Sequence, residues 1–275
     1  MDIDTFLNSM DLKEPTRSIL VETEQLTGKP FVFIHNPGLS VQATVKIARS
    51  SMSHHIVIFS GTDSSLLNHQ IAHECGHIRR YYAAPKDRRL VPESNPQTNQ
   101  AAIAHIEKSS NNLLKSLPID LRYQMIPVWI NGLIYQVTNL PPDIYIEKWI
   151  FERYPELRID QRRSIGLIHE QASKILKPEL RSQFPKIITD SSCAMNYAFY
   201  KKIDEITEST FFKNFKRMPS HEVGESLYHC IREGDGGLVG DIALINEWAG
   251  ILQIGDWFTW TDFENIPPGY EKRGC

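Results

Sequence analysis

The sequence predicts an α+β fold, in which a small N-terminal β-sheet is followed by a largely α-helical C-terminal region. Two observations support this prediction. Three short runs between residues 31 and 59 are rich in β-branched and aromatic residues and are bounded by Gly, Pro and Asn. From residue 65 the apolar residues recur at helical spacing, and almost every segment beyond residue 98 keeps that pattern.

The first part of the chain has the pattern of one helix followed by three strands. Residues 4–26 predict a helix whose apolar stripe includes Leu20, Val21 and Leu26. Gly and Pro residues bound the first strand, and Gly61 ends the third. Three strands that pack on helices are enough to form a small sheet. The predicted strands are residues 31–34, 42–48 and 55–59.

A longer helix is predicted at residues 65–82, with Asp63 or Ser64 as its N-cap. Residues 85–98 contain three prolines and many polar groups, which predicts a loop that either links two domains or covers a site. We expect a domain of residues 1–158 and a mostly helical region of residues 159–275 without a recognisable role, and the alternative is that the two pack as one unit. The further predicted helices are residues 99–116, 120–139, 143–153, 159–176, 190–206 and 219–232.

The composition is typical of a soluble globular protein, with 41% hydrophobic residues and a net charge of -3. That charge gives no general reason to expect binding to nucleic acid. The four cysteines are scattered without a C-x-x-C pair, which favours a reducing compartment. The acidic N-terminus is unlike a signal peptide, and the most apolar run is too short to cross a bilayer. We therefore expect a cytoplasmic protein without a membrane partner.

The motif with the clearest chemistry is His73-Glu74-Cys75-Gly76-His77. Residues four apart on a helix share a face, so His73 and His77 can bind one metal ion, typically zinc. Glu74 is rotated by about 100° around the helix, where its carboxylate can act as a general base on a water molecule at the open side of the ion. Zinc lowers the pKa of bound water and polarises a substrate carbonyl. The motif therefore predicts a Zn2+-dependent hydrolase, in which Gly76 leaves room for close packing.

A catalytic zinc usually has three protein ligands, and no further histidine follows His77 at a short spacing. Asp143 and Glu147 share one face of a predicted helix that starts at the Pro-Pro pair 141–142 and has apolar neighbours. We expect Glu147 to bind the metal and Asp143 to orient a histidine through its second ring nitrogen, and the two roles can be exchanged. The alternative is that Glu147 pairs at the surface with Lys148 or Arg153.

Three more residues have side chains that can bind a metal ion. His69 extends the ladder of His73 and His77 at spacing four, but three residues of such a ladder spread over about 12 Å of helix rise, too far for one ion. We expect His69 at the surface or behind the ligands. Glu93 and Glu107 are weaker acidic candidates for the third ligand.

A strand followed by a motif helix is typical of the zincin metallopeptidases, and this chain resembles them at residues 55–59 and at Ala72-His73-Glu74-Cys75-Gly76-His77. The sequence of the motif is most similar to that of the ImmA/IrrE group. The resemblance covers roughly residues 30–83, with weaker support to about residue 155. It implies a peptidase in which His73, His77 and a downstream acidic residue, here Glu147, bind zinc, and Glu74 is the catalytic base. The interval of 70 positions (147 − 77) between His77 and Glu147 is wider than we expect for that group.

The resemblance also implies a substrate. Members of this group tend to be intracellular regulatory proteases that cut helix-turn-helix repressors, so the expected partner is a protein or peptide, in particular a DNA-binding repressor. In zincins an extended peptide adds to the edge strand before the motif helix. Residues 55–59 are the candidate edge, and an interior strand is the alternative. The competing function is a non-catalytic, metal-stabilised regulatory or binding protein in which Glu74 is not a base.

Overall fold

A computed structural model describes residues 1–39, 41–61, 63–109 and 113–266. The chain has the predicted α+β architecture, with sheets of three and two strands and a largely helical second half. It divides into two compact units. The first contains Met1–Leu90, Tyr145–Gly166 and the segment that begins at Asp262, and the second contains Val91–Ile144 and Leu167–Thr261. The boundary predicted at residues 158 and 159 falls inside the first unit, because residues 145–166 pack with the N-terminal elements.

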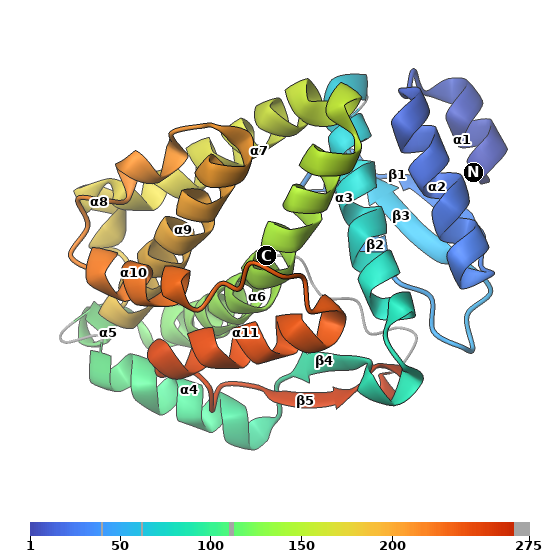
Figure 1. The fold of residues 1–275 in the computed structure, drawn as a ribbon. Helices are drawn as coiled ribbons and strands as arrows, with labels where there is room; N and C mark the ends of the chain where they lie inside the picture. Colours follow the sequence, from blue (N-terminus) through green and yellow to red (C-terminus); the bar gives the residue numbers. More distant parts are fainter. Residues whose placement is uncertain (40, 62, 110–112, 267–275) are drawn as a thin grey trace. The chain divides into compact units, whose positions relative to one another are not determined.

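The first unit begins with two helices where one was predicted: α1 (Ile3–Ser9) and α2 (Glu14–Thr27). The predicted stripe was also partly wrong, because Val21 and Leu26 are exposed while α2 buries Leu20 and neighbours at helical spacing. Gly28 ends α2 in the left-handed region, with φ +65°, which suits a residue without a Cβ. Figure 1 shows α2 alongside α3 (Ser64–Ala83), the helix predicted at residues 65–82.

The three predicted strands are present as β1 (Phe31–His35), β2 (Ala43–Lys46) and β3 (His55–Phe59). Their order is β1-β3-β2, with β1 parallel and β2 antiparallel to β3. β3 is therefore the central strand, and the prediction that it is the edge was wrong. The edge strands are β1 and β2, and β2 also packs against α3.

One face of this sheet forms the core with the helices. Phe6 of α1 stacks on Phe33 of β1 with ring centroids 3.8 Å apart. Ile71 and Ile78 of α3 are fully buried in the same cluster. Residues 145–166 add the second part of α6 (Ile119–Arg153), with Ile146 and its neighbours, and the first part of α7 (Arg158–Ala172). This packing places the motif helix between the sheet and two helical segments far away in the sequence.

The second unit is mainly helical. A short strand, β4 (Leu90–Glu93), lies within the segment predicted as loop, and pairs with β5 (Thr259–Asp262).

The prediction that the Pro-Pro pair 141–142 begins a helix was wrong, since α6 continues through both prolines. Burial of apolar residues before and after the pair offsets a cost of about 3 kcal/mol for proline in a helix. The remaining helices are α4 (Pro96–Ser109), α5 (Leu113–Ser116), α8 (Pro178–Arg181), α9 (Lys186–Thr207), α10 (His221–His229) and α11 (Gly237–Ile251). Within the described residues, none of the helices has the length and apolar character needed to cross a membrane.

Candidate metal centre

The motif lies in the middle of α3, a helix of 20 residues. Asp63 caps it, because its side chain accepts a hydrogen bond of 3.1 Å from the main-chain N–H of Ser65. Cys75 faces the core, and burial raises the pKa of its thiol to about 12, as fits a packed thiol. His73, Glu74 and His77 are each half-buried. The helix therefore leaves part of each of these three residues exposed.

His73 and His77 point their Nε2 atoms at one another, 3.2 Å apart. Two imidazole nitrogens bound to one tetrahedral zinc ion at 2.0–2.1 Å would be about 3.3 Å apart. The observed separation is therefore close to the one that two ligands of a single tetrahedral zinc ion would have. When no ion lies between them, the same contact serves as a hydrogen bond.

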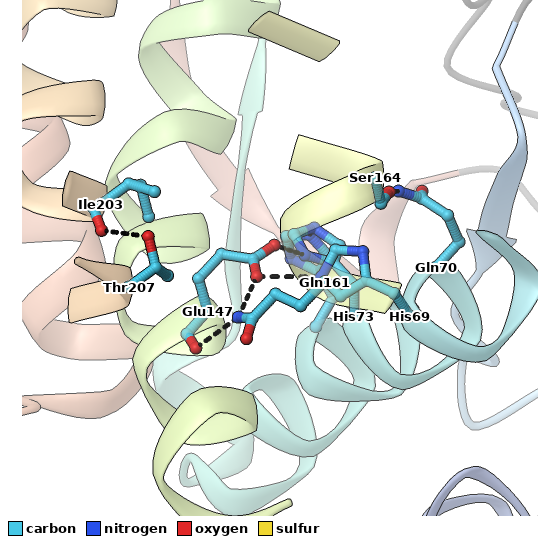
Figure 2. A network of polar contacts seen from close by, with 9 residues as sticks. His69, Gln70, His73, Glu147, Gln161, Ser164, Ile203 and Thr207 are labelled. Carbon is cyan, nitrogen blue, oxygen red and sulfur yellow. Dashed lines mark hydrogen bonds and ion pairs between the residues drawn. The ribbon is translucent and has the colours of Figure 1, made fainter. Parts of the chain in front are cut away.

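Glu147 approaches His73 from α6, as Figure 2 shows. Its Oε1 lies 2.8 Å from Nδ1 of His73, and its Oε2 lies 2.9 Å from Nε2 of His69. The Gln161 side chain donates from Nε2 to Oε2 of Glu147 at 2.6 Å and to the main-chain oxygen of Glu147 at 2.8 Å. Glu147 is 3% exposed, and its contacts with His69 and Gln161 are buried, whereas its contact with His73 is partly buried.

The electrostatics of this group keep the carboxylate ionised. Burial raises the pKa of Glu147, but the charges of His69 and His73 and their hydrogen bonds outweigh burial and hold that pKa well below its usual range. Because an ionised carboxylate only accepts hydrogen bonds, Nδ1 of His73 donates its proton to Glu147. In the neutral form of His73, the form that binds metals, the lone pair is then on Nε2, the nitrogen that points to His77.

Glu147 thus lies in the orienting position that the sequence analysis gave first to Asp143. The surface alternative, in which Glu147 pairs with Lys148 or Arg153, does not describe its contacts, since Glu147 is buried against two histidines. Asp143 lies one helical turn earlier on α6, in the second unit, and its role stays a prediction. The role of Glu147 as a metal ligand also stays a prediction.

His69 and Gln161 have larger roles than their sequence context indicated. A surface position for His69 was wrong, because the residue is fully buried and bonds Glu147. Gln161 was not singled out at all. The sequence signal that points to Gln161 is its spacing of four from Leu157 and from Ile165, which places it on the buried face of this helical segment.

Gly76 permits the close approach of α6 to α3. A Cβ atom at this position would lie 2.6 Å from Cγ2 and 3.1 Å from Cγ1 of the buried Ile146. Ile146 immediately precedes Glu147, so the missing side chain at Gly76 brings the carboxylate within reach of His73. The expectation that Gly76 leaves room for close packing agrees with this contact.

The weaker acidic candidates lie elsewhere. Glu93 ends β4 and Glu107 is exposed on α4, both in the second unit.

Comparisons with protein-family models, with curated proteins and with solved structures gave no match.

Proposed function

We propose that this protein is a zinc-dependent metallopeptidase in which His73 and His77 bind the ion and Glu74 is the general base. The main support is the approach of the two Nε2 atoms to 3.2 Å, the spacing that a tetrahedral zinc ion requires. The contact between Glu147 and Nδ1 of His73 adds to it, because histidines that bind metals usually donate their second N–H to a carboxylate or carbonyl.

Each residue then has a defined task. Bound zinc supplies Lewis acidity, which activates water and polarises a peptide carbonyl. Glu74 takes the proton from the attacking water and returns it to the leaving amine. Glu147 and Asp143 divide two tasks between them. Either Glu147 is the third ligand and Asp143 orients a histidine, or, with the roles exchanged, Glu147 holds His73 in the tautomer with its lone pair on Nε2 and Asp143 is the third ligand.

The sheet edge supports a peptide as the substrate. Ser60 donates its main-chain N–H to the oxygen of Gln42 at 3.0 Å, so in this antiparallel register the N–H and C=O groups of Ala43 and Val45 point away from β3. Among the described residues no hydrogen bond joins these outward groups to another segment. An extended peptide can therefore pair with β2 beside the motif helix.

The opposite edge of the same sheet is already occupied. Phe33 of β1 exchanges main-chain hydrogen bonds with Met1, at 2.8 and 3.2 Å, and the side chain of Glu24 accepts from the N–H of Phe31. This leaves β2 as the edge for peptide addition. A DNA-binding repressor as the natural substrate rests on the ImmA/IrrE resemblance alone.

One observation favours a second candidate function, a metal-stabilised protein without catalysis. The ligand atoms of His69, His73 and Glu147 all lie within 4.8 Å of one another, and two of the three residues are buried. The burial of this group would keep substrate away from a metal held there, which suits a structural site better than a catalytic one. In that arrangement Glu74 has no role in chemistry.

The two functions are separated by Glu74→Gln. We expect the purified wild-type chain to contain close to one zinc per molecule by elemental mass spectrometry, and the variant to keep it. Incubated with a peptide library made from a digested bacterial proteome, the wild type should create new N-termini, and Glu74→Gln should create them at least about 100-fold more slowly. Equal cleavage by both proteins, with zinc retained, would exclude Glu74 as the base.

A further inference from the structure

We propose that His69 and Gln161 are positioning residues that hold the Glu147 carboxylate on Nδ1 of His73, so that Glu147 orients a metal ligand instead of binding the ion itself. This inference rests on the proposed zinc site and deepens it. Its basis is the set of contacts that surround one buried carboxylate (Figure 2).

Both oxygens of Glu147 are engaged. Oε1 accepts from His73, and Oε2 accepts from both His69 and Gln161. Gln161 also binds the main-chain oxygen of Glu147, so one amide group fixes the backbone and the side chain together. His69 and Gln161 are both 0% exposed, so water does not compete for these contacts.

The direction of the His73 ring separates the two roles of Glu147. The two nitrogens of an imidazole point to different sides of the ring, and Nε2 of His73 points to His77. An ion between His73 and His77 therefore lies on the far side of the ring from Glu147. To bind that ion, Glu147 would have to leave His69, Gln161 and Nδ1 of His73 at the same time. The contacts of His69 and Gln161 oppose this movement.

A purely structural role for His69, as a buried residue that fills the core, predicts something different. It predicts that loss of the His69 side chain lowers the stability of the fold but leaves the zinc affinity unchanged. The neighbouring residue offers a matched control, because Gln70 also makes a buried hydrogen bond from α3 to α7, to Ser164 at 2.6 Å, without touching Glu147. The bond lies in the same view as the site (Figure 2).

The experiment measures zinc affinity of the full chain by competition with a chromophoric chelator, together with thermal unfolding of the metal-free protein. We expect His69→Leu and Gln161→Leu to weaken zinc binding by 10- to 100-fold, the range typical of residues that support a ligand. Gln70→Leu should stay within about threefold of the wild type even where its unfolding temperature falls equally, and His69→Gln, which keeps a donor, should recover most of the affinity.

The outcomes distinguish this inference from the proposed function. If the wild type binds no zinc, the metal site itself is wrong, and the inference falls with it. If the wild type binds zinc and His69→Leu and Gln161→Leu bind it as tightly as Gln70→Leu, the zinc site stands and the positioning role is overturned. If His69→Leu does not fold, the comparison of Gln161→Leu with Gln70→Leu decides.

Discussion

Replacement of Gly76 by Ala tests the close contact on which the whole site depends. The new Cβ would lie 2.6 Å from Cγ2 and 3.1 Å from Cγ1 of Ile146, where carbon atoms normally pack 3.5–4.0 Å apart. Ile146 is 1% exposed and is held by the core, so it cannot turn away into solvent. Either α6 moves away from α3, or the Ile146 side chain leaves its preferred rotamer.

The magnitude follows from two opposing effects. Overpacking of a well-packed core costs about 1–3 kcal/mol, whereas Ala in place of Gly in a helix gains about 1 kcal/mol. We expect Gly76→Ala to lower the free energy of unfolding by about 1 kcal/mol. Gly166 of α7 is the matched control, because a Cβ there meets no atom within 4 Å. Gly166→Ala should raise stability by up to about 1 kcal/mol.

The assay is urea unfolding in the presence of EDTA, followed by circular dichroism. A double-mutant cycle adds Ile146→Ala, which removes both clashing atoms. In that background Gly76→Ala should become neutral or stabilising by up to about 1 kcal/mol, a coupling of about 1–2 kcal/mol between the two positions. If Gly76→Ala unfolds at the same or a higher urea concentration than the wild type, as we expect of Gly166→Ala, α6 does not approach α3 as described.

Three further predictions concern pH, the third ligand and a helix end. Burial, with smaller effects from Lys29 and His54, lowers the pKa of His55 to about 4. The unfolded chain therefore binds a proton that the folded chain does not between about pH 6.5 and 4, so stability should fall by about 3 kcal/mol as the pH drops through that window. Urea unfolding of His55→Asn, which keeps an acceptor for the N–H of Ala48, should lack this loss. Zinc analysis of Asp143→Ala and Glu147→Ala tests the exchange of roles: the true ligand is the one whose loss abolishes binding, and the orienting residue the one whose loss weakens it by 10- to 100-fold. Gly28→Ala should lower the unfolding temperature through a cost of about 1 kcal/mol, and an unchanged temperature would contradict the left-handed end of α2.

Local sequence signals were enough for α3 and its motif. The apolar spacing, the cap at Asp63 and the interval of four between His73 and His77 all depend on residues close in the chain. The order of the strands does not. β1 pairs with β3 and skips β2, because the parallel pairing and the central place of β3 depend on tertiary packing that no local pattern encodes.

The part of the site beyond the motif was partly predictable for a similar reason. Helix spacing and burial singled out Glu147, but they do not say which imidazole nitrogen it meets. That depends on how α6 approaches α3, because Glu147 of α6 lies 78 positions after His69 of α3 in the chain. The same limit applies at Pro141 and Pro142, where local rules predict a break and tertiary burial maintains the helix.

The distance in the chain between the two halves of the site has a consequence for its assembly during synthesis. His73 and His77 lie on one helix, so both imidazoles leave the ribosome together, as a pair of weak ligands. Glu147 follows His77 by 70 residues and Gln161 by 84, and at 5–20 residues per second these delays last about 4–17 seconds. If the proposed zinc site is correct, the nascent chain in that interval would bind the ion only loosely, and the ion would be held firmly once the later helices dock on α3.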